Sequence, residues 1–241
     1  MKKLLESSLA YLFNKLIFTL HNRLHTRFSR ADIRYLVFSF SQFGEDLAIQ
    51  RWLDKFNTKK GIYVDVGAFH PIHANNTNLL HKQGWRGINI DLSSEKIARF
   101  NQFRPRDFNL VAAVSDSESE ITILEYDGGL TDRIALSKDD NKSAVGQKPV
   151  HSKVLPTQTL DTIISQCDFP VDTVDYLDID CEGHDLNVLK GLNLKKYKPK
   201  VITIEALDDN NESEIISYLN NNDYILREKI YRTLLFTPTL N

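Results

Sequence analysis

Acidic side chains follow five short apolar segments that have the composition of buried strands. These segments are rich in β-branched and aromatic residues and end at polar turns. The acids at or just beyond their ends are Asp65, Asp91, Asp116, Asp178, Asp180 and Glu205. A single acid of this kind would be interpreted equally well as a helix cap or a solvated surface group. In an open parallel sheet, however, ligands bind outside the carboxyl ends of the strands, so five consecutive acidic ends predict one shared polar site.

The spacing of the first two acids is typical of nucleotide-binding units. Asp65 and Asp91 are 26 positions apart, near the separation at which a βαβ unit places a carboxylate against ribose hydroxyls. Gly67 follows the first strand and frees the backbone for close approach to a ligand. The sequence lacks G-x-G-x-x-G, whose glycines and following helix bind a pyrophosphate. A ligand with ribose hydroxyls and no phosphate therefore suits the site better than a dinucleotide.

Strand and helix patterns alternate along the segments that would position these acids. Strands are predicted at residues 62–66, 86–91, 108–114, 120–126, 174–179 and 201–204, with a terminal hairpin at 224–228 and 232–236. Helices are predicted at 47–56, 76–83, 94–103, 160–164, 186–190 and 212–220, from apolar spacing and capping residues. The polar segment 127–153 is interpreted as a long loop, either a lid over the substrate or disordered chain. This alternation predicts an α/β domain built on a mostly parallel sheet.

The first 40 residues differ in composition from the remainder of the chain. They carry seven basic and two acidic side chains, and apolar residues recur from Leu5 to Leu24 at helical spacing. We therefore expect a basic amphipathic helical extension at 1–40 and a single domain at 41–241. The apolar face of the helix would pack on the domain or on a second subunit, forming a homodimer. The alternative is peripheral docking on an anionic membrane surface.

Composition excludes several other classes of protein. The 30 basic and 32 acidic residues leave no broad positive surface for nucleic acid. Two cysteines, Cys167 and Cys181, are too few for a disulfide framework and favour a reducing compartment. The apolar stretch from Leu9 to Leu20 is too short for a membrane span, and no signal-peptide cleavage site follows it. The expected location is the cytoplasm, with the inner membrane surface as the alternative for a docked helix.

Seven short motifs occur in order between residues 41 and 191. They are Ser41-Gln42-Phe43-Gly44-Glu45-Asp46, Val64-Asp65-Val66-Gly67-Ala68, Gly84-Trp85-Arg86-Gly87-Ile88-Asn89-Ile90-Asp91, Arg104-Pro105-Arg106-Asp107, Thr159-Leu160-Asp161, Ile179-Asp180-Cys181-Glu182-Gly183 and Val188-Leu189-Lys190-Gly191. In this order and spacing, from about Ser41 to Glu205, the chain resembles the FkbM family of S-adenosylmethionine-dependent methyltransferases.

The resemblance implies a class I methyltransferase fold, which is a Rossmann-like, mostly parallel seven-stranded sheet with helices on both faces and an inserted antiparallel last strand. It also implies a set of residues around S-adenosyl-L-methionine. The implied cofactor residues are Asp65, Gly67 and Ala68 at the methionine part, Asn76 and Thr77 facing its carboxylate, Asp91 at the ribose, and Ala113 and Ser115 near the adenine. Two positions depart from the common pattern, namely Ala112-Ala113 in place of an adenine-binding acid and Asp178 in place of a neutral or basic residue.

Methyl transfer to a hydroxyl needs a positioned base or a cation that acidifies the hydroxyl. The candidate bases are Asp180, His184 and His70. Strands four and five should be neighbours, so Asp180 and Glu205 face one cleft, and with His184 they form a candidate site for Mg²⁺ or Mn²⁺. The chain is thus predicted to be an O-methyltransferase for a glycan, nucleotide-sugar or related small metabolite. The alternative is a non-catalytic module that binds an adenosine ligand; a nicotinamide dehydrogenase is disfavoured by the missing glycine motif.

Overall fold

The structure, a computed structural model, describes residues 32–125, 133–134 and 150–239. The chain divides into residues 1–38 and 39–241. The described part of the first unit contains a short 3₁₀ helix, Asp32–Tyr35 (η1), and the amphipathic helix predicted from Leu5 to Leu24 lies outside the described residues. Within the described residues, no helix combines the length and hydropathy that crossing a membrane requires.

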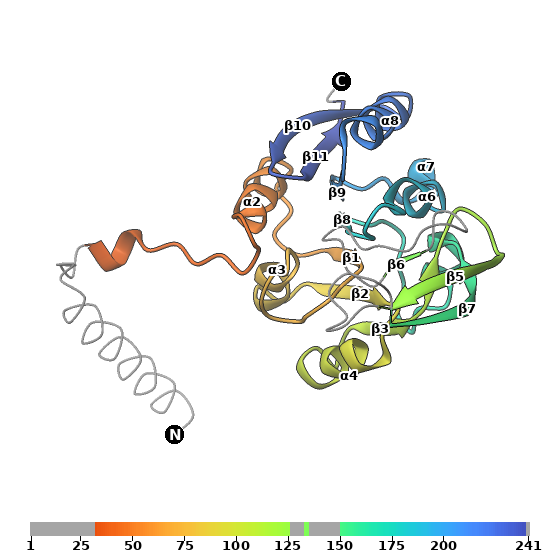
Figure 1. Cartoon of the computed structure of the whole chain (residues 1–241). Helices are drawn as coiled ribbons and strands as arrows, with labels where there is room; N and C mark the ends of the chain where they lie inside the picture. Colours follow the sequence, from red (N-terminus) through yellow and green to blue (C-terminus); the bar gives the residue numbers. More distant parts are fainter. Residues whose placement is uncertain (1–31, 126–132, 135–149, 240–241) are drawn as a thin grey trace. The chain divides into compact units, whose positions relative to one another are not determined.

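A seven-stranded sheet forms the centre of residues 39–241 (Figure 1). In spatial order its strands are β10 (Tyr224–Ile230), β11 (Thr233–Pro238), β9 (Val201–Glu205), β8 (Tyr176–Ile179), β1 (Ile62–Val66), β2 (Arg86–Asp91) and β3 (Phe108–Val111). The five strands from β9 to β3 are parallel, whereas β11 is antiparallel to both β9 and β10. The predicted α/β class, the mostly parallel sheet and the terminal hairpin are therefore confirmed.

The described residues of the domain contain seven α-helices, of which the first precedes the first strand. They are α2 (Glu45–Lys55), α3 (Asn78–Lys82), α4 (Ser94–Phe103), α5 (Leu160–Ser165), α6 (Asp185–Lys190), α7 (Leu194–Tyr197) and α8 (Asp209–Asn220). Side chains cap several of them: Ser93 accepts the amide of Lys96 at the start of α4, and Thr159 accepts that of Thr162 at the start of α5. Helix α2 packs near β9 and β11, α4 on β2 and β3, and α8 on β10, so helices pack near both edges of the sheet.

A second, smaller sheet corrects two predictions. It contains β4 (Ala113–Val114), β7 (His151–Gln158), β5 (Glu120–Glu125) and β6 (Arg133–Ile134). The predicted strand 108–114 is interrupted at Ala112, because its last two residues pair with β7 instead of β2. The predicted loop 127–153 was wrong where the structure describes it, since residues 133–134 and 151–153 pair with β5. Residues 127–132 and 135–149 of that loop lie outside the described ranges.

Alternation along the central strands separates an apolar face from a row of polar side chains. In β1, Val64 and Val66 belong to the larger core cluster, whereas Tyr63 belongs to a second cluster. Because successive side chains point to opposite faces, Asp65 shares the face of Tyr63. The residues that pair at this register on adjacent strands are Asn109, Asn89, Asp65, Asp178 and Thr203. A polar row thus crosses five strands near their carboxyl ends.

Candidate active site

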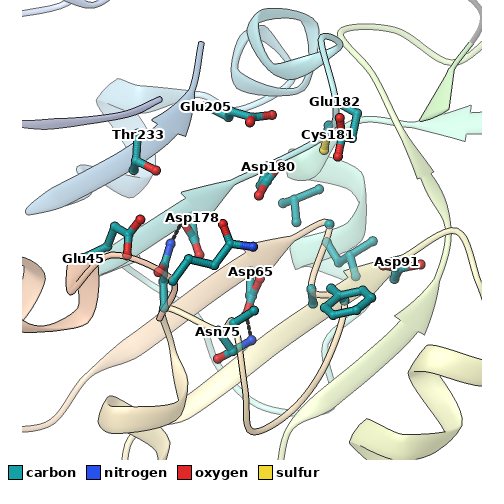
Figure 2. Close-up of a pocket in the computed structure, with 18 of the residues that line it drawn as sticks. Glu45, Asp65, Asn75, Asp91, Asp178, Asp180, Cys181, Glu182, Glu205 and Thr233 are labelled. Atoms are coloured by element: carbon teal, nitrogen blue, oxygen red, sulfur yellow. Dashed lines mark hydrogen bonds between the residues drawn. The ribbon is translucent and has the colours of Figure 1, made fainter. Parts of the chain in front are cut away.

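A cavity of about 360 Å³ opens at the carboxyl ends of β1, β2, β8 and β9. Figure 2 shows Asp91 at one side of it, Glu45 and Thr233 at the other, and Asp180 between them. The cavity is strongly acidic, because two cationic side chains, Lys96 and Arg232, line it together with seven acids. These acids are Glu45, Asp65, Asp91, Asp178, Asp180, Glu182 and Glu205. A positively charged ligand therefore suits its electrostatic field.

The turn after β1 brings two strand-end loops into backbone contact. The amides of Gly67 and Ala68 both donate to the carbonyl of Ile90, at 2.9 and 3.0 Å, so the turn is fastened to β2. Gly67 has a φ of 81°, and a Cβ there would lie 1.8 Å from the carbonyl oxygen of Asp180. Only glycine fits this position. Any side chain would collide with the backbone of Asp180, and a residue with a side chain would have to adopt a left-handed backbone conformation. Gly67 and Ala68 both line the cavity.

Asp65 is buried beneath this turn, and its Oδ2 oxygen is engaged by two donors. Its carboxylate accepts hydrogen bonds from Asn75 Nδ2 at 3.1 Å and from Thr77 Oγ1 at 2.7 Å. Burial raises the pKa of Asp65, and the two hydrogen bonds and nearby Arg104 oppose that rise. Thr77 is completely buried and does not line the cavity, whereas neighbouring Asn76 does. Asn76 Nδ2 donates to Asp178 at 3.2 Å, so the loop after β1 also contacts β8.

The guanidinium of Arg104 holds the underside of the same loop. Arg104 is 1% exposed. Its NH2 group donates to the carbonyl of Pro71 at 2.7 Å and to Asn75 Oδ1 at 2.9 Å. The partners of its NH1 group are Tyr63 Oη, Thr77 Oγ1 and Asn89 Oδ1. Sequence reasoning assigned Arg104 only to a family motif, because its partners come from three distant segments of the chain.

Asp91 lies at the end of β2 and lines the cavity. Its carboxylate accepts the amide of Ser93 at 2.8 Å and forms an ion pair with Lys96 at 3.3 Å. An apolar slot adjoins it, lined by Ile90, Leu92, Ala112 and Val114. Ala113 and Ser115, predicted to lie near an adenine, are buried and do not line the cavity.

Three carboxylates converge on the opposite side of the cavity. Oxygens of Asp180, Asp185 and Glu205 lie within 4.8 Å of one another. Glu205 Oε2 is buried without a hydrogen-bond partner, and burial together with the charge of Asp180 raises the pKa of Glu205 to about 10. Asp180 is accessible through the cavity, yet the protein around it also raises its pKa. Proximity of this kind favours a cation or shared protons.

Asp185 was missed by sequence reasoning, although it completes this carboxylate group. It is fully buried in the first turn of α6, where its carboxylate accepts the amides of Cys181 at 2.7 Å and Gly183 at 2.9 Å. Burial and the charge of Asp180 raise its pKa to about 7. The only feature of the sequence that points to Asp185 is its position as an acid directly after His184, at the predicted start of a helix. Glu45 was also missed, because the sequence showed it only as part of the first family motif, but it lines the cavity.

The two candidate histidines, His70 and His184, are not part of the group of acids that lines the cavity. His184 is buried, its Nε2 is 3.0 Å from Ser115 Oγ, and burial lowers its pKa. His70 stacks on His73 with ring centroids 3.5 Å apart, and its Nδ1 accepts the amide of Ile72. Neither His70 nor His184 lines the cavity. The structure therefore brings Asp180 and Glu205 together with Asp185 and not with His184.

This α/β architecture, with its cavity at the strand ends, is compatible with a methyltransferase. The chain matches the family model described as Methyltransferase FkbM domain over residues 65–226, which is more than half of its length. It therefore belongs to the FkbM methyltransferase family. Comparison with curated proteins gives no significant match.

Proposed function

We propose that this protein transfers a methyl group from S-adenosyl-L-methionine to a hydroxyl of a glycan or a related small metabolite. The observation that carries the proposal is the position of Asp91 beside apolar residues at one side of a cavity whose opposite side holds a buried oxygen of Glu205 without a hydrogen-bond partner. Asp91 lies on β2 and Glu205 on β9, which are three strand spacings apart in the sheet, or roughly 14 Å. That span has room for a nucleoside on one side and an acceptor on the other.

The residues around β1 and β2 fit S-adenosylmethionine. Asp91 would accept the ribose hydroxyls, and the slot formed by Ile90, Leu92, Ala112 and Val114 would take the adenine. The Gly67 turn gives the methionine part a close approach to backbone, and Asn76 supplies a side-chain amide beside it. The cofactor supplies a methyl group activated by a sulfonium cation, and the acidic lining of the cavity suits that positive charge. Because S-adenosylmethionine carries no phosphate, this site needs no phosphate-binding element.

The residues around β8 and β9 would orient the acceptor and receive its proton. Asp180 is accessible between the two sides of the cavity, and a carboxylate with a raised pKa is a competent base near neutral pH. Alignment of the acceptor oxygen with the methyl group would supply much of the rate enhancement. His184 and His70 would need to turn into the cavity to act as bases, so Asp180 is the favoured base.

A divalent cation is a second part of the proposal. Asp180, Glu205 and Asp185 offer three hard oxygen ligands, which suit Mg²⁺ or Mn²⁺, and the unpartnered oxygen of Glu205 favours an added cation or proton. Asp185 would take the place that sequence reasoning gave to His184. The test is exhaustive chelation followed by Mg²⁺ or Mn²⁺ add-back, beside Asp180→Asn and Glu205→Gln. Full activity without metal would leave Asp180 as the direct base.

Calorimetry with S-adenosylmethionine, followed by an assay of methyl transfer over a panel of hydroxyl acceptors, tests the main proposal. Binding with turnover of at least one acceptor is the expected result. Binding without turnover over a broad panel would favour a module that only holds an adenosine ligand. Absence of binding at millimolar cofactor would contradict both functions.

A further inference from the structure

Two aromatic rings stand exposed at the mouth of the cavity. Phe43 is 55% exposed and Tyr231 is 64% exposed, and both line the cavity. Their ring centroids are 4.7 Å apart with an angle of 41° between the planes. An aromatic pair that remains open to solvent beside a cavity offers a large apolar surface to a ligand.

The backbone holds both rings in place. Tyr231 occupies the two-residue turn between β10 and β11 with a φ of 55°, a conformation that favours glycine or asparagine and is strained for a tyrosine. The next residue, Arg232, accepts the amide of Ala206 at 2.9 Å, which fastens the turn to the end of β9. On the other side, the amide of Phe43 donates to Glu45 Oε2 at 2.8 Å. Each residue of the pair therefore lies in a turn whose backbone is held by a hydrogen bond.

The residues that line the cavity with this pair are mostly acidic. They include Glu45, Asp180 and Glu182, together with Glu205, whose raised pKa keeps it protonated near neutral pH. One cation is also present, because the guanidinium of Arg232 lies 5.6 Å from the centroid of the Tyr231 ring. Carboxylates accept hydrogen bonds from hydroxyl and amino groups, whereas they repel phosphates and other carboxylates. The apolar face of a sugar ring packs well on an aromatic ring while its edge presents hydroxyls.

We propose that the Phe43–Tyr231 pair and these carboxylates form the acceptor subsite, and that its ligand is a sugar ring bearing neither phosphate nor carboxylate. The inference rests on the proposed methyl transfer and narrows its substrate class. The ring stacks against Tyr231, its hydroxyls donate to the carboxylates, and an amino group on the ring strengthens binding. Sugar phosphates and nucleotide-sugars are disfavoured as acceptors, because acids outnumber the single cation, Arg232, beside the pair.

Saturation-transfer NMR on the full chain loaded with S-adenosylhomocysteine tests this subsite. The probes are glucose, galactose and mannose, each as the free sugar, the 2-amino sugar and the 6-phosphate, at millimolar concentration. We expect transfer to ring protons of free or amino sugars, with the 6-phosphates at least about tenfold weaker. Tyr231→Ala should abolish the transfer. Tyr231→Gly, which suits the left-handed backbone, provides a second truncation without strain.

Phe103→Ala is the matched control, because Phe103 is half exposed and does not line the cavity. Preference for the 6-phosphates, no transfer to any of these sugars, or undiminished transfer in both Tyr231 variants would overturn the proposal. Calorimetry with S-adenosylhomocysteine distinguishes failure of the subsite proposal from failure of the proposed function. Any of these results with normal cofactor binding would refute the acceptor subsite alone. Absence of cofactor binding to the wild type would refute the proposed methyl transfer.

Discussion

The two sides of the cavity differ in how completely their polar groups are satisfied. Around β1 and β2, Asp65 accepts hydrogen bonds from Asn75 and Thr77, and Asp91 is engaged by Ser93 and Lys96. Around β8 and β9, Glu205 keeps a buried oxygen without a partner, and its pKa is raised to about 10. Buried polar groups are ordinarily paired. Arg104 Nε beneath the first side also lacks a partner, but of the unpartnered buried atoms in the described residues only the Glu205 oxygen belongs to a residue that lines the cavity. That oxygen therefore identifies where a ligand, proton or cation is still to be added.

We interpret the satisfied side of the cavity as the part that positions the cofactor, and the unsatisfied side as the part where the acceptor reacts. The satisfied side is rigid before any ligand arrives, because Arg104 and the Gly67 turn fix its loop from below and beside. Such preorganisation suits a cofactor that always binds in one way. The unsatisfied side stores electrostatic strain that an acceptor, a proton or a cation relieves.

Substitution of Gly67 should have the largest effect. Gly67→Ala combines a φ of 81° with a Cβ only 1.8 Å from the Asp180 carbonyl, so we expect a loss of about 3 kcal/mol or more in unfolding free energy and loss of S-adenosylhomocysteine binding. Urea unfolding and calorimetry measure the two effects. Gly84→Ala is the control, because its φ is 90° but only the flexible end of Lys60 lies nearby. It should cost about 1 kcal/mol, and equal costs at both positions would show that the two loops are not in contact.

Removal of the buried guanidinium should rank second. Arg104→Met leaves the Asp65 region without its buried cation and removes the donor described for the Pro71 carbonyl and for Asn89 Oδ1. We expect destabilisation of about 3 kcal/mol by urea unfolding. Arg99→Met provides the comparison on the same helix, because Arg99 is exposed and pairs only with Glu95 among the contacts described. Its cost should stay within about 0.5 kcal/mol, and a similar small cost for Arg104→Met would contradict the preorganised side.

Sequence patterns were sufficient for the parallel sheet and for the acids at its strand ends. β-Branched runs and caps such as Ser93 define these elements locally, and α4 was predicted with both bounds correct, at Ser94–Phe103. The second sheet was not predictable in this way, because the polar strand His151–Gln158 is specified by its pairing with β5 and β4 rather than by its own apolar period. Asp185 and Arg104 were missed for the same reason, since their roles depend on contacts between distant segments.

The acidic side should give the smallest effect on stability, and an opposite one. The pKa of Glu205 is higher in the folded protein than the ordinary value of 4.5, so its contribution to stability is full below about pH 4.5 and is lost as the pH rises towards about 10. Glutamine cannot titrate. In metal-free protein, Glu205→Gln should therefore gain at least about 1 kcal/mol relative to wild type between pH 5 and pH 8, as measured by urea unfolding. Glu214→Gln, which removes an exposed acid outside the cavity, is the control, and an identical pH dependence in both variants would count against a strained Glu205.

Calorimetry of S-adenosylhomocysteine binding to wild type, Asp91→Ala and Glu205→Gln tests the division of the cavity most directly. The loss of charge-assisted hydrogen bonds to the ribose should weaken binding to Asp91→Ala by about 2 kcal/mol. Glu205→Gln, on the acceptor side, should bind within about threefold of wild type, which is less than 1 kcal/mol. Normal binding to Asp91→Ala together with weakened binding to Glu205→Gln would contradict the assignment of the two sides, and absence of binding to the wild type would contradict the function itself.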